Sequence, residues 1–478
     1  METLLSVALL AVTLAMVVAS ILWAYIWSQP RVNGRLPPGS LGLPLLGETM
    51  QFFAPNTTCD VSLFVKERID RYGAIFKTSI VGRSVVVSAD PELNYYVFQQ
   101  EGKLFESWYP DTFTEIFGRD NVGSLHGFMY KYLKTLVLRL YGQESLRAGL
   151  LAETDRACRA SLAAWATQPS VELKDAISTM IFDLTAKKLI SYEPSRSSES
   201  LRKNFVAFIR GLISFPVDIR GTAYHECMQG RKKAMKVLKT MMRERMAEPG
   251  RRSEDFFDVL IEELRREKPV MTEAVALDLM FVLLFASFET TALALTLGIK
   301  LLAENPRVLE AVTEEHEAIA RNRKDSDAEL TWAEYKSMTF TSQVTLEIVR
   351  LANIVPGIFR KALQDIEYKG YTIPAGWGVM VCPPAVHLNP EIYEDPLAFN
   401  PWRWQGKMEI TGGTKHFMAF GGGLRFCVGT DLSKVLMATF IHCLVTKYSW
   451  KTVKGGNIVR TPGLSFPDGL HVQLFPKN

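Results

Sequence analysis

The sequence FGGGLRFCVG, residues 420–429, is the most specific segment of this 478-residue chain. It holds a single cysteine, Cys427, among glycines that let the backbone approach a neighbouring group closely. Isolated buried cysteines are usually inert packing residues. Arg425, however, can stabilise a thiolate or a nearby anionic ligand. The pattern F-x-x-G-x-R-x-C-x-G is one that chance rarely supplies, and five positions satisfy it: Phe420, Gly423, Arg425, Cys427 and Gly429.

The composition limits the classes of protein to consider. Hydrophobic residues make up 47% and charged residues 22%, which is typical of globular proteins and excludes global disorder. Lys and Arg (55) nearly balance Asp and Glu (51), so a dedicated nucleic-acid binder is not expected. The six cysteines form no C-x-x-C pair, which argues against a disulfide scaffold or structural zinc and for a reducing compartment.

The amino terminus predicts a membrane anchor. Leu4–Trp27 carries no charge, and its 24 residues are enough to cross about 30 Å of hydrocarbon as a helix. Arg31 and Arg35 follow, so the positive-inside bias leaves the rest of the chain cytosolic. A cleaved signal peptide is the weaker alternative, because no basic segment precedes the apolar run. The expected organisation is a single-pass transmembrane anchor (1–27), a proline-rich spacer (28–47) and one catalytic domain (48–478).

The pattern beyond residue 48 predicts mostly helix with a minor β region. Ile75–Asp90 is β-branched and apolar on either side of Val81-Gly82-Arg83, which indicates a hairpin. Ile366–Val381 indicates further short strands. Helical periodicity marks four amphipathic segments: Leu173–Leu189, Glu199–Ser214, Arg231–Ala247 and Asp255–Arg266.

One predicted helix is longer and more apolar than the others. It begins after Thr272, a candidate N-cap, and ends before Pro306, a length of about 45–50 Å. A second membrane span is the alternative interpretation. A charge at its middle, Glu289, would cost about 2.5–3.5 kcal/mol on insertion scales. We therefore expect a helix through the protein core with a polar site at mid-length, ASFETT (286–291).

Further motifs follow in order along the chain. Glu347 and Arg350 form E-x-x-R, an i,i+3 pair on one helical face. The segment VPGIFR (355–360) contributes Arg360, and FNPWRW (399–404) contributes Arg403. Each motif alone carries little information.

Together these motifs resemble the cytochrome P450 family, and the resemblance spans the whole chain. It implies a mainly α fold with a minor β region and haem b as the cofactor. Cys427 would be the metal ligand, whose thiolate favours O–O cleavage. Glu347, Arg350 and Arg403 match a structural triad that locks the segment ahead of the haem loop.

The resemblance also implies roles around the haem. Phe420, Gly423, Arg425 and Gly429 would belong to the haem-binding loop, and Arg360 would bind a propionate by a strong charge-assisted contact.

In ASFETT, the resemblance implies an oxygen-activation motif. The small side chain of Ala286 would leave room for O2, and the Thr290 hydroxyl would help to deliver protons. Ala286 and Thr290 share a helical face because they are i,i+4. Glu289 would feed that relay through water.

Two positions depart from the family pattern. Ser287 replaces the usual glycine and adds a hydroxyl able to alter the local water chain without abolishing activity. Where the family has W-x-x-x-R, this chain has Tyr130 and Lys134. Both side chains can bind a propionate, although the lysine ammonium is a point charge and lacks the bidentate geometry of an arginine guanidinium.

The resemblance is strongest to plant microsomal members that oxidise sterols, brassinosteroids and triterpenoids. FPVDIRGTAYH (215–225) and FASFETT (285–291) resemble a subgroup linked to sterol side-chain oxidation and cucurbitane hydroxylation. The leading hypothesis is hydroxylation of a plant sterol on its side chain. Successive oxidations of neighbouring side-chain carbons would break the C–C bond and give a pregnenolone-type steroid. The alternative is ring hydroxylation of a cucurbitane-type triterpenoid. Candidate residues lining the substrate space are Trp108, Phe113, Phe117, Phe215, Ile354, Val355, Phe359, Leu464 and Phe466.

The implied partners are membrane lipid and an NADPH-dependent reductase in the endoplasmic-reticulum membrane. Lys131, Lys415 and Lys434 are candidates for the docking face of the reductase. Two other classes stay open: a reductase-independent haem-thiolate isomerase or dehydratase, which the Glu289-Thr290 pair disfavours, and a haem-free membrane interaction protein.

Overall fold

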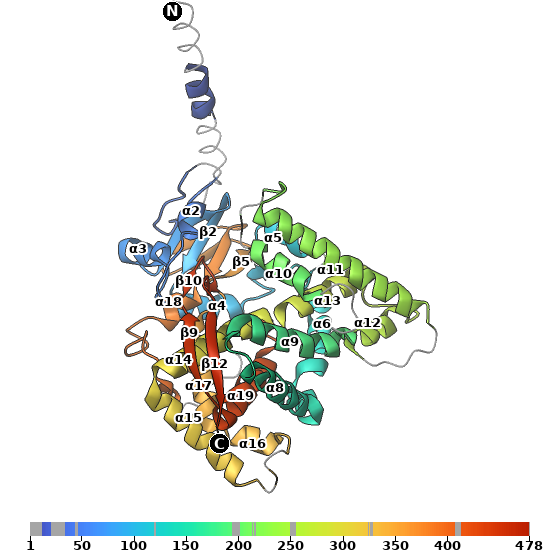
Figure 1. Ribbon diagram of the computed structural model, residues 1–478. Coiled ribbons are helices and arrows are strands. Elements are labelled where there is room, and N and C mark those ends of the chain that lie inside the picture. Colours follow the sequence, from blue (N-terminus) through green and yellow to red (C-terminus); the bar gives the residue numbers. More distant parts are fainter. Residues whose placement is uncertain are drawn as a thin grey trace, which may run out of the picture.

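The computed structural model describes residues 12–20, 34–43, 46–118, 121–193, 201–212, 214, 217–248, 255–323, 325, 328–406 and 413–477. Helices make up most of the body, and the larger sheet lies at one side of it, beside α2 and α3 (Figure 1). The prediction of a mainly α fold with a minor β region is therefore confirmed.

The helices are α2 (Thr49–Phe52), α3 (Leu63–Tyr72), α4 (Pro91–Gln99), α5 (Asp111–Phe117), α6 (Gly127–Tyr141), α7 (Gln143–Ser145), the π-helix η1 (Leu146–Leu150), α8 (Leu151–Ala166), α9 (Leu173–Ile190), α10 (Leu201–Leu212), α11 (Ala223–Met246), α12 (Phe256–Leu264), α13 (Glu273–Ala286), α14 (Glu289–Glu304), α15 (Pro306–Arg321), α16 (Trp332–Ser337), α17 (Thr339–Ala352), α18 (Pro383–His387), the 3-10 helices η3 (Pro401–Trp404) and η4 (Gly423–Arg425), and α19 (Thr430–Lys447).

The strands form small sheets. The largest has the order β1-β2-β8-β5-β3, and a three-stranded sheet has the order β4-β12-β9. The predicted hairpin is confirmed: β1 and β2 pair with Ile80 opposite Arg83, and Val81 and Gly82 in the turn have φ of 53° and 70°. The strands are β1 (Ile75–Ile80), β2 (Arg83–Ser88), β3 (Phe105–Ser107), β4 (Val171–Glu172), β5 (Ile358–Ala362), β6 (Ile366–Tyr368), β7 (Tyr371–Ile373), β8 (Gly378–Val381), β9 (Tyr448–Gly455), β10 (Val459–Arg460), β11 (Leu464–Ser465) and β12 (Leu470–Pro476).

The long central helix runs through the core but is not continuous. Thr272 caps it as predicted, by accepting a hydrogen bond from the Val275 N–H. The helix then breaks at Ser287–Phe288, which separates α13 from α14. By length and composition Glu273–Glu304 could cross a membrane, but 72% of its most apolar window is buried inside the protein. That burial favours a core helix over the alternative of a second membrane span.

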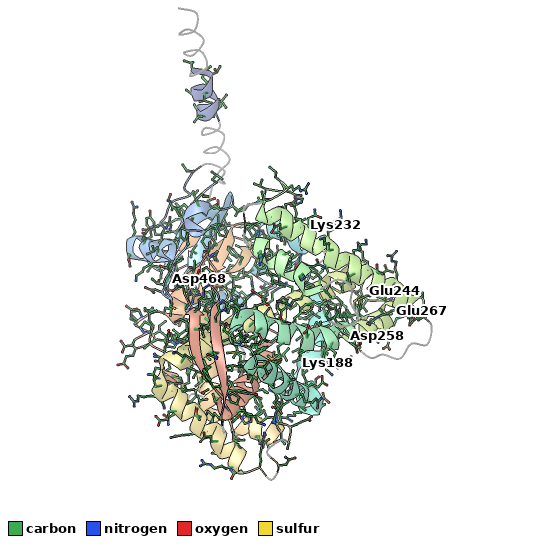
Figure 2. All side chains as sticks on the ribbon, in the orientation of Figure 1. Lys188, Lys232, Glu244, Asp258, Glu267 and Asp468 are labelled. Carbon is green, nitrogen blue, oxygen red and sulfur yellow. The ribbon has the colours of Figure 1, made fainter. Side chains whose placement is uncertain are left out.

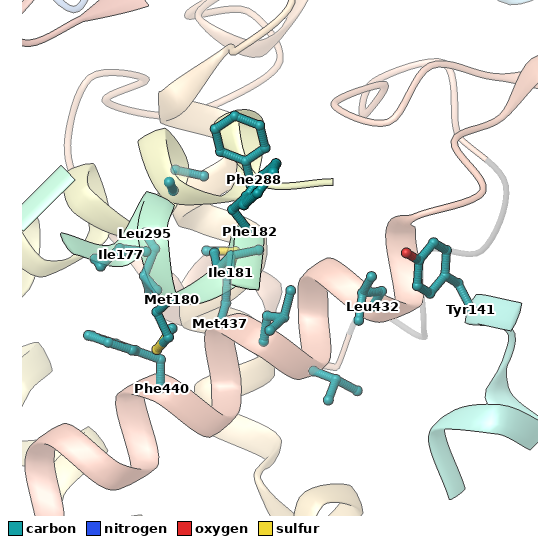
Figure 3. Close-up of a cluster of buried hydrophobic side chains, with 14 of the residues drawn as sticks. Tyr141, Ile177, Met180, Ile181, Phe182, Phe288, Leu295, Leu432, Met437 and Phe440 are labelled. Carbon is teal, nitrogen blue, oxygen red and sulfur yellow. The ribbon is translucent and has the colours of Figure 1, made fainter. Parts of the chain in front are cut away.

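Aromatic and aliphatic side chains pack α14 against α9 and α19. Phe182 of α9 meets Phe288 edge to face at 5.2 Å, beside Leu295 of α14 (Figure 3). Met437 and Phe440 of α19 close the other side of this cluster (Figure 3). On the outside, charged residues such as Lys232 and Glu244 of α11 point away from the body (Figure 2). The core thus fixes the central helix relative to the segment that follows Cys427.

The carboxy-terminal strands return to much earlier parts of the chain. β12 pairs with β4, some three hundred residues earlier, and with β9. The buried Arg460 donates hydrogen bonds to the carbonyls of Leu351, Ala352 and Asn353 at the end of α17. Lysine or arginine at a helix C-terminus satisfies carbonyls that lack a partner within the helix.

The predicted anchor lies mostly outside the described residues. Residues 12–20 are helical, and Figure 1 shows them apart from the body. Their apolar side chains are exposed, with Leu14 at 66%. The spacer and the domain boundaries remain predictions.

Candidate functional site

The middle of the central helix carries an exposed face. Ala286 and Thr290 are exposed there, although Phe288, Glu289 and Ala292 around them are buried. The Thr290 hydroxyl donates to the Ala286 carbonyl at 3.3 Å. The two predicted residues therefore share an exposed face of a helix that is otherwise mostly buried.

The Cys427 loop carries an exposed residue as well. Cys427 has an exposed surface, although burial raises the pKa of its thiol. The Thr291 hydroxyl lies 3.1 Å from that of Ser433, on α19 just after the loop. We infer that Ala286, Thr290 and Cys427 face one internal space.

The loop holds its shape through close backbone contacts. The Cys427 N–H donates to the Phe420 carbonyl at 3.0 Å. Gly423 has φ of +62°, and a Cβ there would lie 2.2 Å from the carbonyl oxygen of Phe98. The Gly429 N–H favours the thiolate and offsets part of the rise in the pKa of Cys427. These contacts explain the predicted glycines.

Buried charges gather beside the loop. The Glu101 carboxylate contacts Nε of Arg360 at 2.5 Å and Nε of Arg425 at 2.7 Å. The Tyr130 ring lies under the Arg425 guanidinium, with 4.2 Å from Cζ to the centroid. Lys134 donates to the carbonyl of Leu424, within the loop itself. The structure thus brings together Arg360, Arg425, Tyr130 and Lys134, and adds Glu101, which we did not predict.

This cluster carries an excess of positive charge. Arg360, Arg425 and Lys134 supply three cations, against the single carboxylate of Glu101. Burial, followed by the charge of Arg425, lowers the pKa of the neighbouring His126, so this imidazole adds no charge near neutral pH. Two positive charges are left, which matches a group that carries two carboxylates. A haem with its two propionates fits this site, with Cys427 facing the space where its iron would lie.

Glu289 pairs with a lysine of a neighbouring helix. Its Oε1 lies 2.6 Å from Nζ of Lys174 on α9, and its Oε2 is buried without a hydrogen-bond partner among the described residues. No sequence signal indicated the contact with Lys174. The relay from Glu289 to Thr290 through water stays a prediction.

Ser287 also turns toward α9. Its hydroxyl lies 3.0 Å from that of Thr185, which is itself 2.8 Å from the Ile181 carbonyl. The Ser287 hydroxyl also lies 3.2 Å from the Leu284 carbonyl of its own helix, so either hydroxyl can donate in the contact with Thr185. The hydroxyl expected to alter the water chain is therefore engaged at the break of the helix.

The predicted triad residues meet in the core. Glu347 contacts Arg350 at 2.7 Å and Arg403 at 2.9 Å, and Glu347 and Arg350 have fully buried side chains. The indole N–H of Trp404 donates to the same carboxylate at 2.9 Å, a partner that sequence reasoning missed. Arg350 also donates to the carbonyls of His387, Pro396 and Ala398. The triad fixes the segment that leads to the Cys427 loop.

Part of the predicted substrate lining forms an aromatic row. Phe113 contacts Phe117 at 4.4 Å between centroids, and Phe117 meets Phe285, the residue before Ala286, at 5.4 Å. Trp108 meets Phe359 at 6.2 Å. Tyr109 joins the two groups by contacts with Phe113 and Phe359, and Phe208 packs on Phe117. Tyr109, Phe208 and Phe285 were not predicted.

The remaining lining residues are distributed differently. Val355 is 42% exposed, and Ile354 is partly buried beside it. Leu464 and Phe466 pack with the main core, and among the described residues no ring contact joins Phe466 to the aromatic row. Phe215 lies outside the described residues. Of the docking candidates, Lys415 pairs with Glu92 at 2.7 Å.

The fold and the thiol-bordered space with its cationic cluster define a helical haem-thiolate protein. A cytochrome P450 family model matches residues 37–471, and the chain belongs to the cytochrome P450 family, whose members are oxidoreductases with a haem–thiolate iron centre that use O2. The chain is therefore a plant-type P450 monooxygenase.

Curated relatives match nearly the full length. The chain is 84% identical to cytochrome P450 87A3 of Oryza sativa subsp. japonica over 95% of this chain and 89% of that one. It is 42% identical to cucurbitadienol 11-hydroxylase of Siraitia grosvenorii (95% and 96%). It is 36% identical to a cholesterol 22-monohydroxylase of Paris polyphylla (96% and 97%). A solved cyanobacterial P450 with bound retinoic acid superposes with a TM-score of 0.82 at 26% identity, over 93% of this chain and 100% of that one.

Proposed function

We propose that this protein hydroxylates a rigid polycyclic triterpenoid or sterol at the space between α13–α14 and the Cys427 loop. The observation that carries the proposal is the exposed face of Ala286 and Thr290 beside the aromatic row of Phe113, Phe117 and Phe285. Flat aromatic rings bind fused apolar rings and exclude water.

Two substrates follow from the relatives. Sterol side-chain hydroxylation, continued to C–C cleavage and a pregnenolone-type product, is supported by the cholesterol 22-monohydroxylase at 36% identity. Ring hydroxylation of a cucurbitane-type triterpenoid is supported by the cucurbitadienol 11-hydroxylase at 42% identity. The higher identity favours the triterpenoid, and the two substrates differ in which part of the molecule must reach the space beside Thr290.

Residues of this chain would have separate roles in haem binding and in proton transfer. Cys427 would ligate the haem iron, and Arg360 and Lys134 would bind the propionates. The bound haem supplies O2 activation, with electrons from NADPH through a reductase. Thr290 would hold a proton at Oγ1, beside the Ala286 carbonyl. Glu289 would exchange protons with that face only after leaving Lys174.

The direct test is product identification. Endoplasmic-reticulum membranes that contain the protein and a P450 reductase would receive cholesterol, a phytosterol or cucurbitadienol, with NADPH. We expect a hydroxylated product from at least one of them and none without NADPH. Turnover without NADPH would indicate the isomerase or dehydratase class instead.

A variant tests the ligand assignment separately. Cys427→Ala should lose the thiolate-type carbon monoxide spectrum, because the sulfur that faces the internal space is gone. Cys227→Ala is the matched control, since Cys227 is equally free but buried in α11. A thiolate-type spectrum retained in Cys427→Ala would show that another residue binds the iron.

A further inference from the structure

Glu101 lies at the junction of the cationic cluster, in the loop between α4 and β3. Its side chain is only 3% exposed, and each of its oxygens contacts a different guanidinium. Oε1 also accepts the Ser107 N–H at 3.1 Å. Oε1 is fixed by hydrogen bonds from Arg425 and Ser107, whereas Oε2 pairs with Nε of Arg360 through charge alone, without hydrogen-bond geometry.

The two arginines that share Glu101 have different surroundings. Besides its Glu101 contact, Arg425 donates to the carbonyls of Val122 and Leu125. These bonds tie residues 121–126 to the Cys427 loop. The hydrogen-bonding capacity of Arg425 is thus largely used within the protein.

The described residues do not use all the hydrogen-bond donors of the Arg360 guanidinium. Its Nε contacts Glu101, and its Nη1 donates to the Phe359 carbonyl at 2.8 Å. Its Nη2 makes no hydrogen bond to any of the described residues. Arg360 is 3% exposed, so this donor is held in a protein environment and not in bulk water.

We propose that Glu101 is a positioning residue for haem binding. By holding Nε of both arginines, it fixes Arg360 with Nη2 available to a propionate, and it fixes Arg425 as the tie between the 121–126 loop and the Cys427 loop. Without this carboxylate, the two guanidinium groups would repel each other across a buried gap. This inference rests on the haem assignment above and is independent of the substrate.

A purely electrostatic role predicts the opposite effect. The negative charge of Glu101 would lie close to the two propionates of the haem and repel them. If charge alone mattered, removal of this carboxylate would strengthen the attraction between the cationic cluster and the propionates. Positioning and charge therefore predict opposite changes in haem retention, and a measured rate of haem loss separates them.

The experiment compares Glu101→Gln with Glu106→Gln in the full-length holoprotein. Glu106 is a matched control, because it lies on the adjoining strand β3 but pairs at the partly exposed surface with Lys361. Haem loss is followed as transfer to excess apomyoglobin, and the ferric/ferrous midpoint potential is measured on the same samples.

We expect Glu101→Gln to lose haem about tenfold faster than the wild type, the size of one charge-assisted hydrogen bond. Its midpoint potential should shift to more positive values, because a buried negative charge near the iron is removed. Glu106→Gln should match the wild type in both measurements. An unchanged or slower rate of haem loss in Glu101→Gln would overturn the proposal.

Glu101→Asp covers the case in which Glu101→Gln does not fold. It keeps the charge but is one methylene too short to span both arginines, so we expect an intermediate rate of haem loss. A wild-type rate in Glu101→Asp would show that charge alone suffices and would also overturn the proposal. A wild type without a thiolate-type carbon monoxide band would refute the haem assignment itself, a result distinct from all of these.

Discussion

Thr290 is the residue whose hydroxyl lies nearest to the chemistry we propose. It is exposed on the central helix, and among the described residues its Oγ1 bonds only to the Ala286 carbonyl of its own helix, at a long 3.3 Å. A hydroxyl with this weak internal bond can donate to a ligand at little cost, since exchanging one hydrogen bond for another is nearly neutral.

Thr290→Ala should therefore uncouple the enzyme. We expect NADPH consumption to continue with product reduced about tenfold, and hydrogen peroxide to replace it, because a positioned proton donor contributes at least this much. Thr296→Ala is the matched control: Thr296 makes the same type of bond, to Ala292, but is fully buried. Coupling unchanged in Thr290→Ala would remove this residue from the proton path.

At the scale of elements, the break between α13 and α14 is attached to α9. The hydroxyls of Ser287 and Thr185 are hydrogen-bonded to each other, and the ring of Phe288 meets that of Phe182. Lys174, at the start of α9, holds Glu289. The position of the break relative to the internal space thus depends on α9.

A double-mutant cycle should detect this attachment. Ser287→Ala and Thr185→Val should each reduce the free energy of unfolding by about 1 kcal/mol, with a coupling energy of similar size. Ser178→Ala on α9 is the control, because the buried Ser178 hydroxyl has no hydrogen-bond partner in the described part of the chain and its loss should cost little. Additive effects in urea unfolding would show that the two hydroxyls do not interact.

A buried histidine pair joins α15 to α19. His442 Nδ1 lies 3.0 Å from His316 Nδ1, and His316 Nε2 lies 2.8 Å from the Thr341 hydroxyl on α17. Burial, followed by the charge of Arg323, lowers the pKa of His442 to about 4. Burial, followed by the charge of His442, also lowers that of His316.

This pair should make stability fall in mild acid. Between about pH 6.5 and pH 4 the unfolded chain binds the His442 proton and the folded chain does not, so stability is lost as the pH falls through this window. The contribution of His442 is on the order of 3 kcal/mol, and it is fully present above pH 6.5. Urea midpoints at pH 7, 6 and 5 should fall less steeply in His442→Gln, and equal slopes would contradict the assignment.

At the scale of the whole molecule, the proposed anchor can be separated from the body. Residues 12–20 are an exposed apolar helix apart from the packed elements, and the family match begins at residue 37. Deletion of residues 1–27 should move the protein from the carbonate-resistant membrane fraction to partial solubility, with its thiolate-type carbon monoxide spectrum intact. Loss of that spectrum on deletion would show that the segment supports the fold.

Sequence reasoning predicted features that local patterns encode. The hairpin at Val81-Gly82, the cap at Thr272 and the Glu347–Arg350 pair depend on neighbouring residues. Side-chain partners distant along the chain were missed. Lys174 and Glu101 carry no motif, and only the packing of α9 and α4 brings them to Glu289 and Arg425.

The cationic cluster also sets an order of events during biosynthesis. Its members are spread from residue 101 to residue 425, and Cys427 follows them directly. A nascent chain cannot assemble these charges until nearly all of it has been translated, although its early helices can pack before then. Arg460, which caps α17, and β12, which pairs with β4, are made later still. Cofactor capture must therefore await almost complete translation, so a chain that stops before residue 425 should accumulate as apoprotein and be removed by quality control.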